Sequence, residues 1–292
     1  MFLRPGHGEG GGYLLRTIKT AKPRPELSEF VEVYAQREMD CGDAVFSQAN
    51  SSSLQPGIGF HFDGQTVLDY PDGRTRPGPK TYVFGGLTPP CGGTSFSGHI
   101  LAFAVFLKPL SLWPLFRIPS NVIFNRDYDA ELLLGREILD LWSKLAECET
   151  FEARVLAAER YLLPFASRSR GRTLITRTAH HMLDCKGAVR IDEIADQARL
   201  SVRQYERRFL EEIGLTPKTF ARTTRFQRAL DAKRFFPCRT WLSIAHEFGY
   251  FDQMHMVRDF QLLCGVTPNN FLDLSGDIQP WSLPAHKALE LR

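Results

Sequence analysis

A pattern of apolar, helix-capping and helix-ending residues occurs twice between Ile194 and Phe271, and this repeat constrains the fold of the 292-residue chain most. The first copy consists of Ile194-Ala195, Leu200-Ser201, Tyr205, Phe209, Gly214, Thr216-Pro217 and Phe220. The second copy consists of Ile244-Ala245, Phe251-Asp252, Met256, Phe260, Gly265, Thr267-Pro268 and Phe271. The copies are offset by 50 residues at the Ile-Ala pair and by 51 from the turn onward, so the repeat keeps its register with one extra residue in the second turn.

Each copy predicts a short helix, a turn and a second helix. The Ile-Ala pair lies on the short helix, where the alanine lets another backbone pack close. Ser201 and Asp252 stand at equivalent positions after the turn, and both are of types whose side chains accept hydrogen bonds from the free N–H groups at a helix start. Gly214 and Gly265 mark the ends of the second helices, and the Thr-Pro that follows each is typical of a new helix start.

The second helix of each copy is predicted to have an inner and an outer face. The inner residues are spaced i, i+4, which places them on one side of a helix. With the residues of the short helices and the caps, the predicted scaffold is Ile194, Ala195, Ser201, Tyr205, Phe209, Ile244, Ala245, Asp252, Met256 and Phe260. The outer faces carry Arg203, Glu206 and Arg207 in the first copy, and Gln253, Met254, Val257 and Arg258 in the second.

A short helix, a tight turn and a second helix form a helix-turn-helix unit, whose outer face can enter the major groove of DNA. The second copy reads Ile244-Ala245-His246-Glu247-Phe248-Gly249-Tyr250, then Asp252-Gln253, Asp259-Phe260 and Gly265-Val266-Thr267-Pro268. It resembles the signature of the AraC/XylS-type transcription regulators nearly residue for residue. The resemblance covers about residues 172 to 273, and the first copy is looser, with Arg190 in place of a capping hydroxyl.

A long helix is predicted between the copies, from Phe220 to Phe235, with Phe226 and Leu230 facing inward and Pro237 stopping it. In the family an equivalent helix holds the two units apart. The resemblance therefore implies that the two recognition helices enter successive major grooves, roughly one turn or ~34 Å apart.

The side-chain types of the outer faces suggest how bases are contacted. Arginine makes bidentate hydrogen bonds with guanine, glutamine pairs with adenine, glutamate accepts from cytosine N4, and apolar side chains contact the thymine methyl group. We therefore predict base contacts for the seven outer-face residues, with phosphate contacts as the alternative. Glu206 has a second interpretation, in which it orients a neighbouring arginine.

Composition sets the wider frame. A chain of 292 residues with 43% hydrophobic content suits about two domains. Residues 165–275 contain 18 Lys and Arg against 12 Asp and Glu, so the excess positive charge lies on the part with the repeat. The six cysteines are scattered without C-x-x-C spacing, which predicts reduced structural thiols and no zinc site. No apolar run approaches the ~20 residues that span a bilayer, and we expect no membrane contact and a cytoplasmic protein.

The N-terminal part is predicted to be rich in β-strands, as a small barrel or sandwich, which makes the whole chain α+β. The strand candidates are Ile58 to Phe62, Thr66 to Tyr70, Thr81 to Phe84, His99 to Lys108 and Val122 to Phe124, with a turn at Pro71-Asp72-Gly73. Leu27 to Tyr34 is an alternative helix. Two amphipathic helices between Ala130 and Pro164 offer either a cover for the sheet or a dimer interface.

These patterns divide the chain into five parts. We expect a flexible leader over residues 1–25, a β-rich regulatory, effector or dimerisation domain over 26–166, a linker over 167–172, a DNA-binding domain over 173–275 beginning with a helix at Leu174 to Leu183, and a tail over 276–292.

Aromatic residues of the β-rich domain are candidates for an apolar effector pocket. They are Phe60, Phe62, Tyr82, Phe84, Phe103 and Phe106, and the alternative is that they form the domain core. His61 and His99 lack the H-x-H pattern with a downstream Glu and His, so they predict structural histidines and no metal or other cofactor.

Together these observations predict a sequence-specific, two-domain transcription regulator, whether activator or repressor, and not an enzyme. The expected partners are double-stranded DNA, a second copy of the chain as a homodimer, a small-molecule effector and RNA polymerase. One alternative is an enzyme centred in the β-rich domain, although no Ser-His-Asp set, carboxylate pair or metal cluster supports it. The other is an N-terminal scaffold that dimerises without sensing, which a filled β-domain interior would favour.

Overall fold

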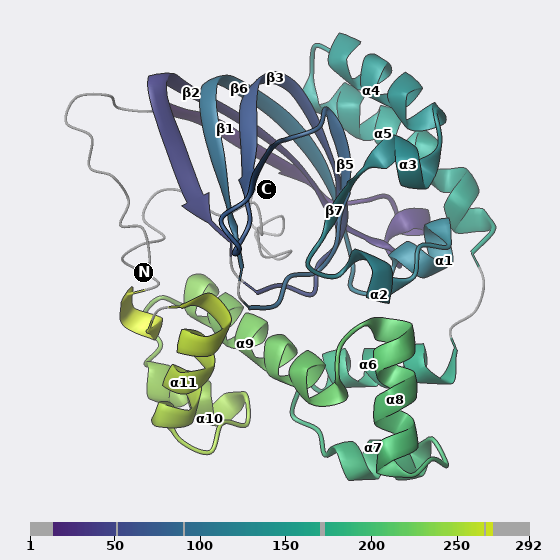
Figure 1. The fold of residues 1–292 in the computed structure, drawn as a ribbon, viewed down its shortest axis with the longest axis vertical. Helices are drawn as coiled ribbons and strands as arrows, with labels where there is room; N and C mark the ends of the chain where they lie inside the picture. Colours follow the sequence, from purple (N-terminus) through teal and green to yellow (C-terminus); the bar gives the residue numbers. More distant parts are fainter. Residues whose placement is uncertain (1–13, 51, 90, 170–172, 266, 271–292) are drawn as a thin grey trace.

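The computed structural model describes residues 14–50, 52–89, 91–169, 173–265 and 267–270 (Figure 1). An antiparallel sheet with helices beside it forms the N-terminal domain, and the C-terminal domain consists of helices. The predicted α+β class and the order of its two parts are thus confirmed. Among the described residues, no helix is both long and apolar enough to cross a membrane.

The sheet of the N-terminal domain has seven strands in the order β1-β2-β6-β3-β5-β7, with β4 paired to β3. The strands are β1 (Leu14–Ala21), β2 (Val31–Ala49), β3 (Gly57–Asp69), β4 (Thr75–Pro77), β5 (Thr81–Phe84), β6 (Gly93–Leu107) and β7 (Asp127–Asp129). The three long strands β2, β3 and β6 shift register at the same level, where Gly64 and Gly98 adopt φ of +78° and +75°. Such bulges bend a sheet, and Figure 1 shows the strands curving around a concave face.

Four expectations for this domain are wrong in part. The predicted leader contains β1, which pairs with β2 along the sheet edge. Thr66 to Tyr70 continues β3 rather than forming a strand of its own, and the predicted turn at residues 71–73 leads into β4. The alternative helix at Leu27 to Tyr34 is a 3₁₀ turn, η1 (Pro25–Leu27), followed by β2. Val122 and Ile123 belong to a short helix that ends before Phe124, and the edge partner of β5 is β7.

Five helices accompany the sheet: α1 (Leu112–Phe116), α2 (Ser120–Ile123), α3 (Ala130–Leu134), α4 (Glu137–Glu147) and α5 (Phe151–Ser167). The first predicted amphipathic run is divided into α3 and α4 at Gly135, whose φ is +78°. Helices α4 and α5 bury their apolar faces against one face of the sheet, in a core that includes Phe60 and Phe103. Of the two roles left open for these helices, the structure therefore supports the cover for the sheet.

The C-terminal domain consists of α6 (Leu174–Asp184), α7 (Ile191–Gln197), α8 (Val202–Ile213), α9 (Pro217–Phe235), α10 (Trp241–Glu247) and α11 (Gln253–Cys264). It has two separate hydrophobic cores, one around α6, α7 and α8 and the other around α10 and α11. Helix α9 belongs to both, because Phe220 packs in the first core while Phe226 and Leu230 pack in the second.

The segment between β2 and β3 connects the two domains. Both the backbone N–H and the hydroxyl of Ser52 donate to the carbonyl of Leu263 at the end of α11, the latter at 2.7 Å. The side chain of Gln227 on α9 accepts from the Leu54 N–H and donates to the Ser53 hydroxyl. Leu54 itself is buried in the core of the first helical unit.

A partly exposed cluster of titratable groups lies beside the bulges. His99 on β6 has its Nδ1 2.9 Å from the Asp63 carboxylate on β3 and its Nε2 3.4 Å from the Glu38 carboxylate on β2. The hydrogen bond with Asp63 is the main cause that raises the pKa of His99, and Glu38 adds to it. Because this pKa is raised above its ordinary value, protonated His99 stabilises the fold below pH 6.5, and the contribution is lost as the pH rises through the folded-state pKa.

We therefore expect His99→Gln to destabilise the protein more in mild acid than in mild base. The difference in Tm between the wild type and this variant, measured by circular dichroism, should be larger near about pH 5.5 than near about pH 8.5. Replacement of the exposed His246 by glutamine serves as the control for a histidine outside this cluster. An equal Tm difference at both pH values would contradict the proposed pairing.

Candidate nucleic-acid interface and interior cavity

Helices α7 and α8 form one helix-turn-helix unit, and α10 and α11 form the other. The predicted inner-face residues Tyr205, Phe209, Met256 and Phe260 are all fully buried, and the two Ile-Ala pairs are at most 2% exposed. The hydroxyl of Tyr205 donates to Thr178 on α6 at 2.9 Å, so this inner face also fixes α8 to the leading helix. Each unit is thus held by its own buried aromatic and aliphatic side chains.

The ends of the recognition helices are defined by the residues that the repeat shares. The Ser201 hydroxyl accepts from the N–H of Gln204, whose side chain accepts from the N–H of Ser201 in return. Asp252 accepts from the N–H of His255 at 2.6 Å. Gly214 and Gly265 end the helices with φ of +86° and +77°, in the left-handed region that glycine adopts without strain.

Helix α7 begins without a side-chain cap at Arg190, the position where the first copy departs from the pattern. Arg190 instead pairs with Asp192 at 2.6 Å and with Glu193 at 3.4 Å, both in the first turn. Acidic residues favour the positive end of the helix dipole, and their arginine partner neutralises them. The departure in sequence therefore leaves the unit itself complete.

The outer faces of α8 and α11 are open to solvent. Of the seven predicted contact residues, Val257 is half-buried and the other six are exposed: Arg203, Glu206, Arg207, Gln253, Met254 and Arg258. The Nε atom of Arg207 lies 3.9 Å from Glu211, one turn away, in an exposed pair of the kind that contributes little to stability. These side chains are available to a partner without rearrangement of the cores, and their contacts with bases remain a prediction.

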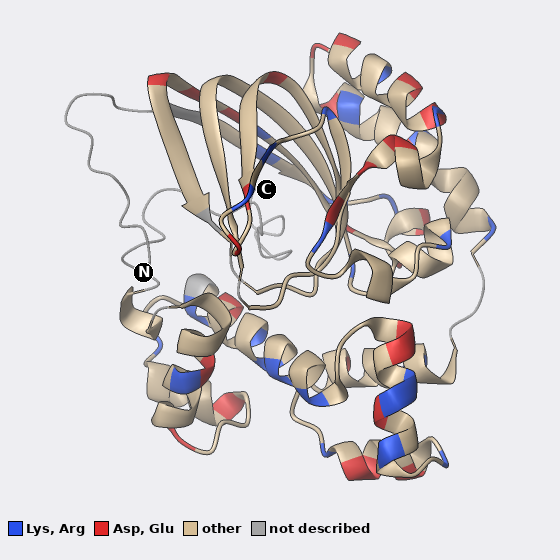
Figure 2. Cartoon of the chain, viewed as in Figure 1, with Lys and Arg blue, Asp and Glu red and all other residues tan. Residues whose placement is uncertain are grey.

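Charged contacts join the two units through α9 and the turn before α7. Lys186 in that turn lies 3.4 Å from Glu247 on α10, and Arg239 pairs with the same carboxylate at 2.6 Å. Hydrogen bonding with Arg239 is the main cause that lowers the pKa of Glu247. On the other side, Arg222 of α9 lies 3.4 Å from Asp259 of α11, which is 4% exposed and whose pKa burial raises. Figure 2 shows the basic residues along α8 and α9.

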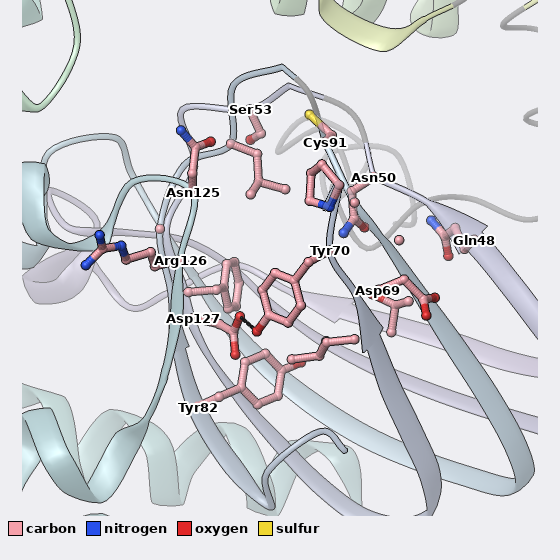
Figure 3. A pocket seen from close by; sticks show the side chains of 18 of the residues that line it. Gln48, Asn50, Ser53, Asp69, Tyr70, Tyr82, Cys91, Asn125, Arg126 and Asp127 are labelled. Atoms are coloured by element: carbon pink, nitrogen blue, oxygen red, sulfur yellow. Dashed lines mark hydrogen bonds between the residues drawn. The ribbon is translucent and has the colours of Figure 1, made fainter. Parts of the chain in front are cut away.

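A second candidate site is a cavity of about 490 Å³ on the concave face of the sheet. Its walls come from β3, β5, β6 and β7 and from the loops around residues 50–55 and 85–93. Figure 3 shows Tyr70, Tyr82 and Asp127 pointing into it. Most of the lining is apolar, as expected for a small-molecule site.

Some polar groups of the cavity are paired with neighbouring side chains. Tyr70 donates to Asp127 at 2.9 Å, and Arg76 also pairs with that carboxylate. The Tyr82 hydroxyl lies 3.3 Å from Nε2 of His61. Burial lowers the pKa of His61 to about 4, so this imidazole is neutral at physiological pH and offers one donor and one acceptor.

Half of the six aromatic residues predicted for a pocket line the cavity. Tyr82, Phe84 and Phe106 line the cavity, whereas Phe60 and Phe103 are buried in the core beneath α4 and α5. The predicted pocket role of those two residues and of Phe62, which packs against the same core, is wrong because neighbouring strand residues point to opposite faces. The same alternation identifies His61, which lies between Phe60 and Phe62, as a missed lining residue. Tyr70 and Asp127 were missed because they come from a strand end and from an edge strand.

Comparison with known proteins bears on both domains. A family model described as a helix-turn-helix domain matches residues 194–273. An apo ToxT variant from Vibrio cholerae shares 11% identity over 86% of this chain and 98% of that chain, with a TM-score of 0.50. Wild-type ToxT from that organism with bound unsaturated fatty acid shares 11% identity over 90% of this chain and 96% of that chain, with a TM-score of 0.47. The AraC-like transcriptional activator CuxR shares 14% identity over 74% of this chain and 86% of that chain, with a TM-score of 0.30. No curated protein matches the sequence significantly.

The match to the helix-turn-helix family model confirms the resemblance noted from the repeat. The matched segment begins at Ile194 and so includes both predicted units. At 11% identity, the likeness to ToxT shows a common fold over most of both chains.

Tyr205→Ala tests the assignment of inner and outer faces. Removing a fully buried aromatic side chain should lower the free energy of unfolding by about 3–5 kcal/mol, because a cavity replaces the ring. Arg203→Ala, two positions away on the exposed face, should change it by less than about 0.5 kcal/mol. Urea unfolding followed by circular dichroism measures both, and an unaltered curve for Tyr205→Ala would mean that the faces are reversed.

Proposed function

We propose that this AraC-type DNA-binding transcription regulator recognises a bipartite operator through the outer faces of α8 and α11, and that a small ligand in the N-terminal cavity adjusts this binding. The observation that carries the proposal is that helix α9 packs into the cores of two complete helix-turn-helix units. Two recognition helices fixed on one rod favour two half-sites at a constant spacing.

The residue types of the outer faces support sequence-specific contact. Arg203 and Arg207 on α8, with Arg258 on α11, have the planar donor groups that match guanine O6 and N7. Gln253 lies in the first turn of α11, where recognition helices commonly contact base edges. The basic residues along α9 suit the phosphates between the two half-sites (Figure 2).

The cavity supports a sensing role for the N-terminal domain, since a domain that served only as a scaffold would be expected to have a filled interior. Around Tyr70 and Tyr82 the cavity carries little net charge, because Arg76 neutralises Asp127 and His61 is uncharged at physiological pH. The chemistry therefore favours a ligand with an apolar body and an uncharged hydroxyl or carbonyl group near His61 and Tyr82.

Contacts between the cavity wall and the helical domain give a route from ligand to DNA. Ser53 lines the cavity and bonds with Gln227 of α9. Cys91, another lining residue, lies 3.7 Å from the hydroxyl of Ser52, which in turn donates to α11. A ligand that displaces this wall would change the hydrogen bonds that hold α9 and α11. Formation of a homodimer stays a further prediction, which light scattering of the purified protein would test.

Selection of duplexes from a randomised pool by the full-length protein tests the DNA-binding part. We expect enrichment of a motif in two parts whose centres lie about one helical turn apart. A motif in one part would contradict the use of both units, and failure to enrich any duplex, with or without added ligand, would contradict the proposed function.

Arg258→Ala should relax the specificity at one or two base pairs of a single half-site. Loss of a bidentate contact with guanine reduces the discrimination against other bases by about 1–3 kcal/mol. Binding of the variant to a panel of single-base operator changes, followed by fluorescence anisotropy, measures this effect. Lys218→Ala, at the exposed start of α9, is the control and should leave the base preferences unaltered.

Ala104→Leu should abolish the response to ligand and preserve DNA binding. Ala104 lines the cavity and is 1% exposed, so a larger side chain there occupies the space for a ligand. In a thermal-shift screen of small apolar alcohols and phenols, compounds that raise the Tm of the wild type should fail to raise that of the variant. Equal shifts for the two proteins would place the ligand elsewhere.

A further inference from the structure

The outer faces of the two recognition helices differ in chemistry at matched positions. The constant offset of 51 residues pairs Arg203 with Met254 and Glu206 with Val257, while Arg207 and Arg258 are both arginine. Helix α8 has six charged residues among its twelve, and α11 has two, of which Asp259 is buried. The two units therefore present different surfaces from the same backbone framework.

The turn before α11 adds to the apolar character of the second unit's outer face. Leu200, the residue that precedes the cap in the first unit, packs against the core of that unit. Its counterpart Phe251 is 89% exposed, and Met254 three residues later is 58% exposed. Met254 and Arg258, at positions i and i+4, share one face of α11, and Phe251 lies immediately before the Asp252 cap of the same helix.

Two large apolar side chains exposed at a helix start are unfavourable in water unless a partner covers them. In the major groove, the C5 methyl group of thymine is the apolar group that a base pair presents, and the other groups are hydrogen-bond donors and acceptors. Met254 and Phe251 lie at the helix end from which a recognition helix contacts base edges. Their chemistry therefore fits thymine better than any other base.

We infer that the second unit recognises thymine methyl groups through Phe251, Met254 and Val257, and that the first unit recognises its half-site by hydrogen bonds from Arg203 and Arg207. The operator is then asymmetric, with one half-site dependent on thymine methyl groups and the other independent of them. This inference rests on the proposed DNA-binding function and specifies the bases that one unit selects.

Replacement of thymine by deoxyuridine tests the inference, because it removes the C5 methyl group and keeps O4 and the base pairing. Each thymine in the operator selected by the full-length protein is replaced in turn, and affinities are measured by fluorescence anisotropy. At thymines contacted by α11, we expect about a fourfold loss of affinity for each methyl group, the value for burial of one such group. Thymines of the other half-site should tolerate the replacement.

Variants at matched positions assign the effect to a unit. Met254→Ala should bind the thymine and deoxyuridine duplexes equally at the positions where the wild type distinguishes them. Arg203→Ala, the matched change in the first unit, should keep the fourfold difference and relax the base preference in the opposite half-site. Phe251→Ser is a second variant in an exposed turn, where folding does not depend on the side chain, and it should also reduce the methyl effect.

The outcomes separate this inference from the function on which it rests. Enrichment of a bipartite operator without methyl effects, or with methyl effects that persist in both Met254→Ala and Phe251→Ser, would overturn the inference and leave the proposed function standing. In that case the exposed apolar residues would be a surface for another protein. Failure of the wild-type protein to bind any duplex would overturn the proposed function itself.

Discussion

The geometry of the DNA-binding domain depends on one helix that is buried at two places. Helix α9 contributes Phe220 to the core of the first unit, and Phe226 with Leu230 to the core of the second. Because a helix of this length is stiff, the two recognition helices have little freedom to move apart or rotate independently. The close approach of Gly187 to the backbone of Ala221 and the Arg222–Asp259 pair add fixed contacts on both sides of this rod.

The same helix also contacts the N-terminal domain. Gln227 of α9 and Leu263 of α11 bond with three consecutive residues, Ser52 to Leu54, in a segment that borders the cavity. Each such hydrogen bond contributes about 0.5–1.5 kcal/mol. A ligand that binds two arrangements of this segment with a tenfold difference in affinity supplies about 1.4 kcal/mol, so ligand and interdomain contacts are of comparable strength.

Local patterns predicted the helical domain well because its elements are stabilised mainly by neighbours in sequence. The helix ends are defined by Ser201, Asp252, Gly214 and Gly265 through hydrogen bonds that span three or four residues. Such local bonds can be predicted from the residue types alone. The sheet was harder to predict, since its bonds join distant segments. Strand β1 is defined by pairing with β2, and residues 120–123 are helical although their composition suits a strand.

The sequence alone determined that two helix-turn-helix units exist, where their helices begin and end, and which of their faces are buried. It also contained the asymmetry between α8 and α11, since Arg203 and Met254 occupy matched positions. The tertiary structure decided which aromatic residues enclose the cavity, because Phe60 and Tyr82 are separated by the sheet itself and only strand register and curvature assign them to its faces. It also decided that Phe251 lies open to solvent while Leu200 is packed, because burial depends on what the rest of the chain places beside each residue.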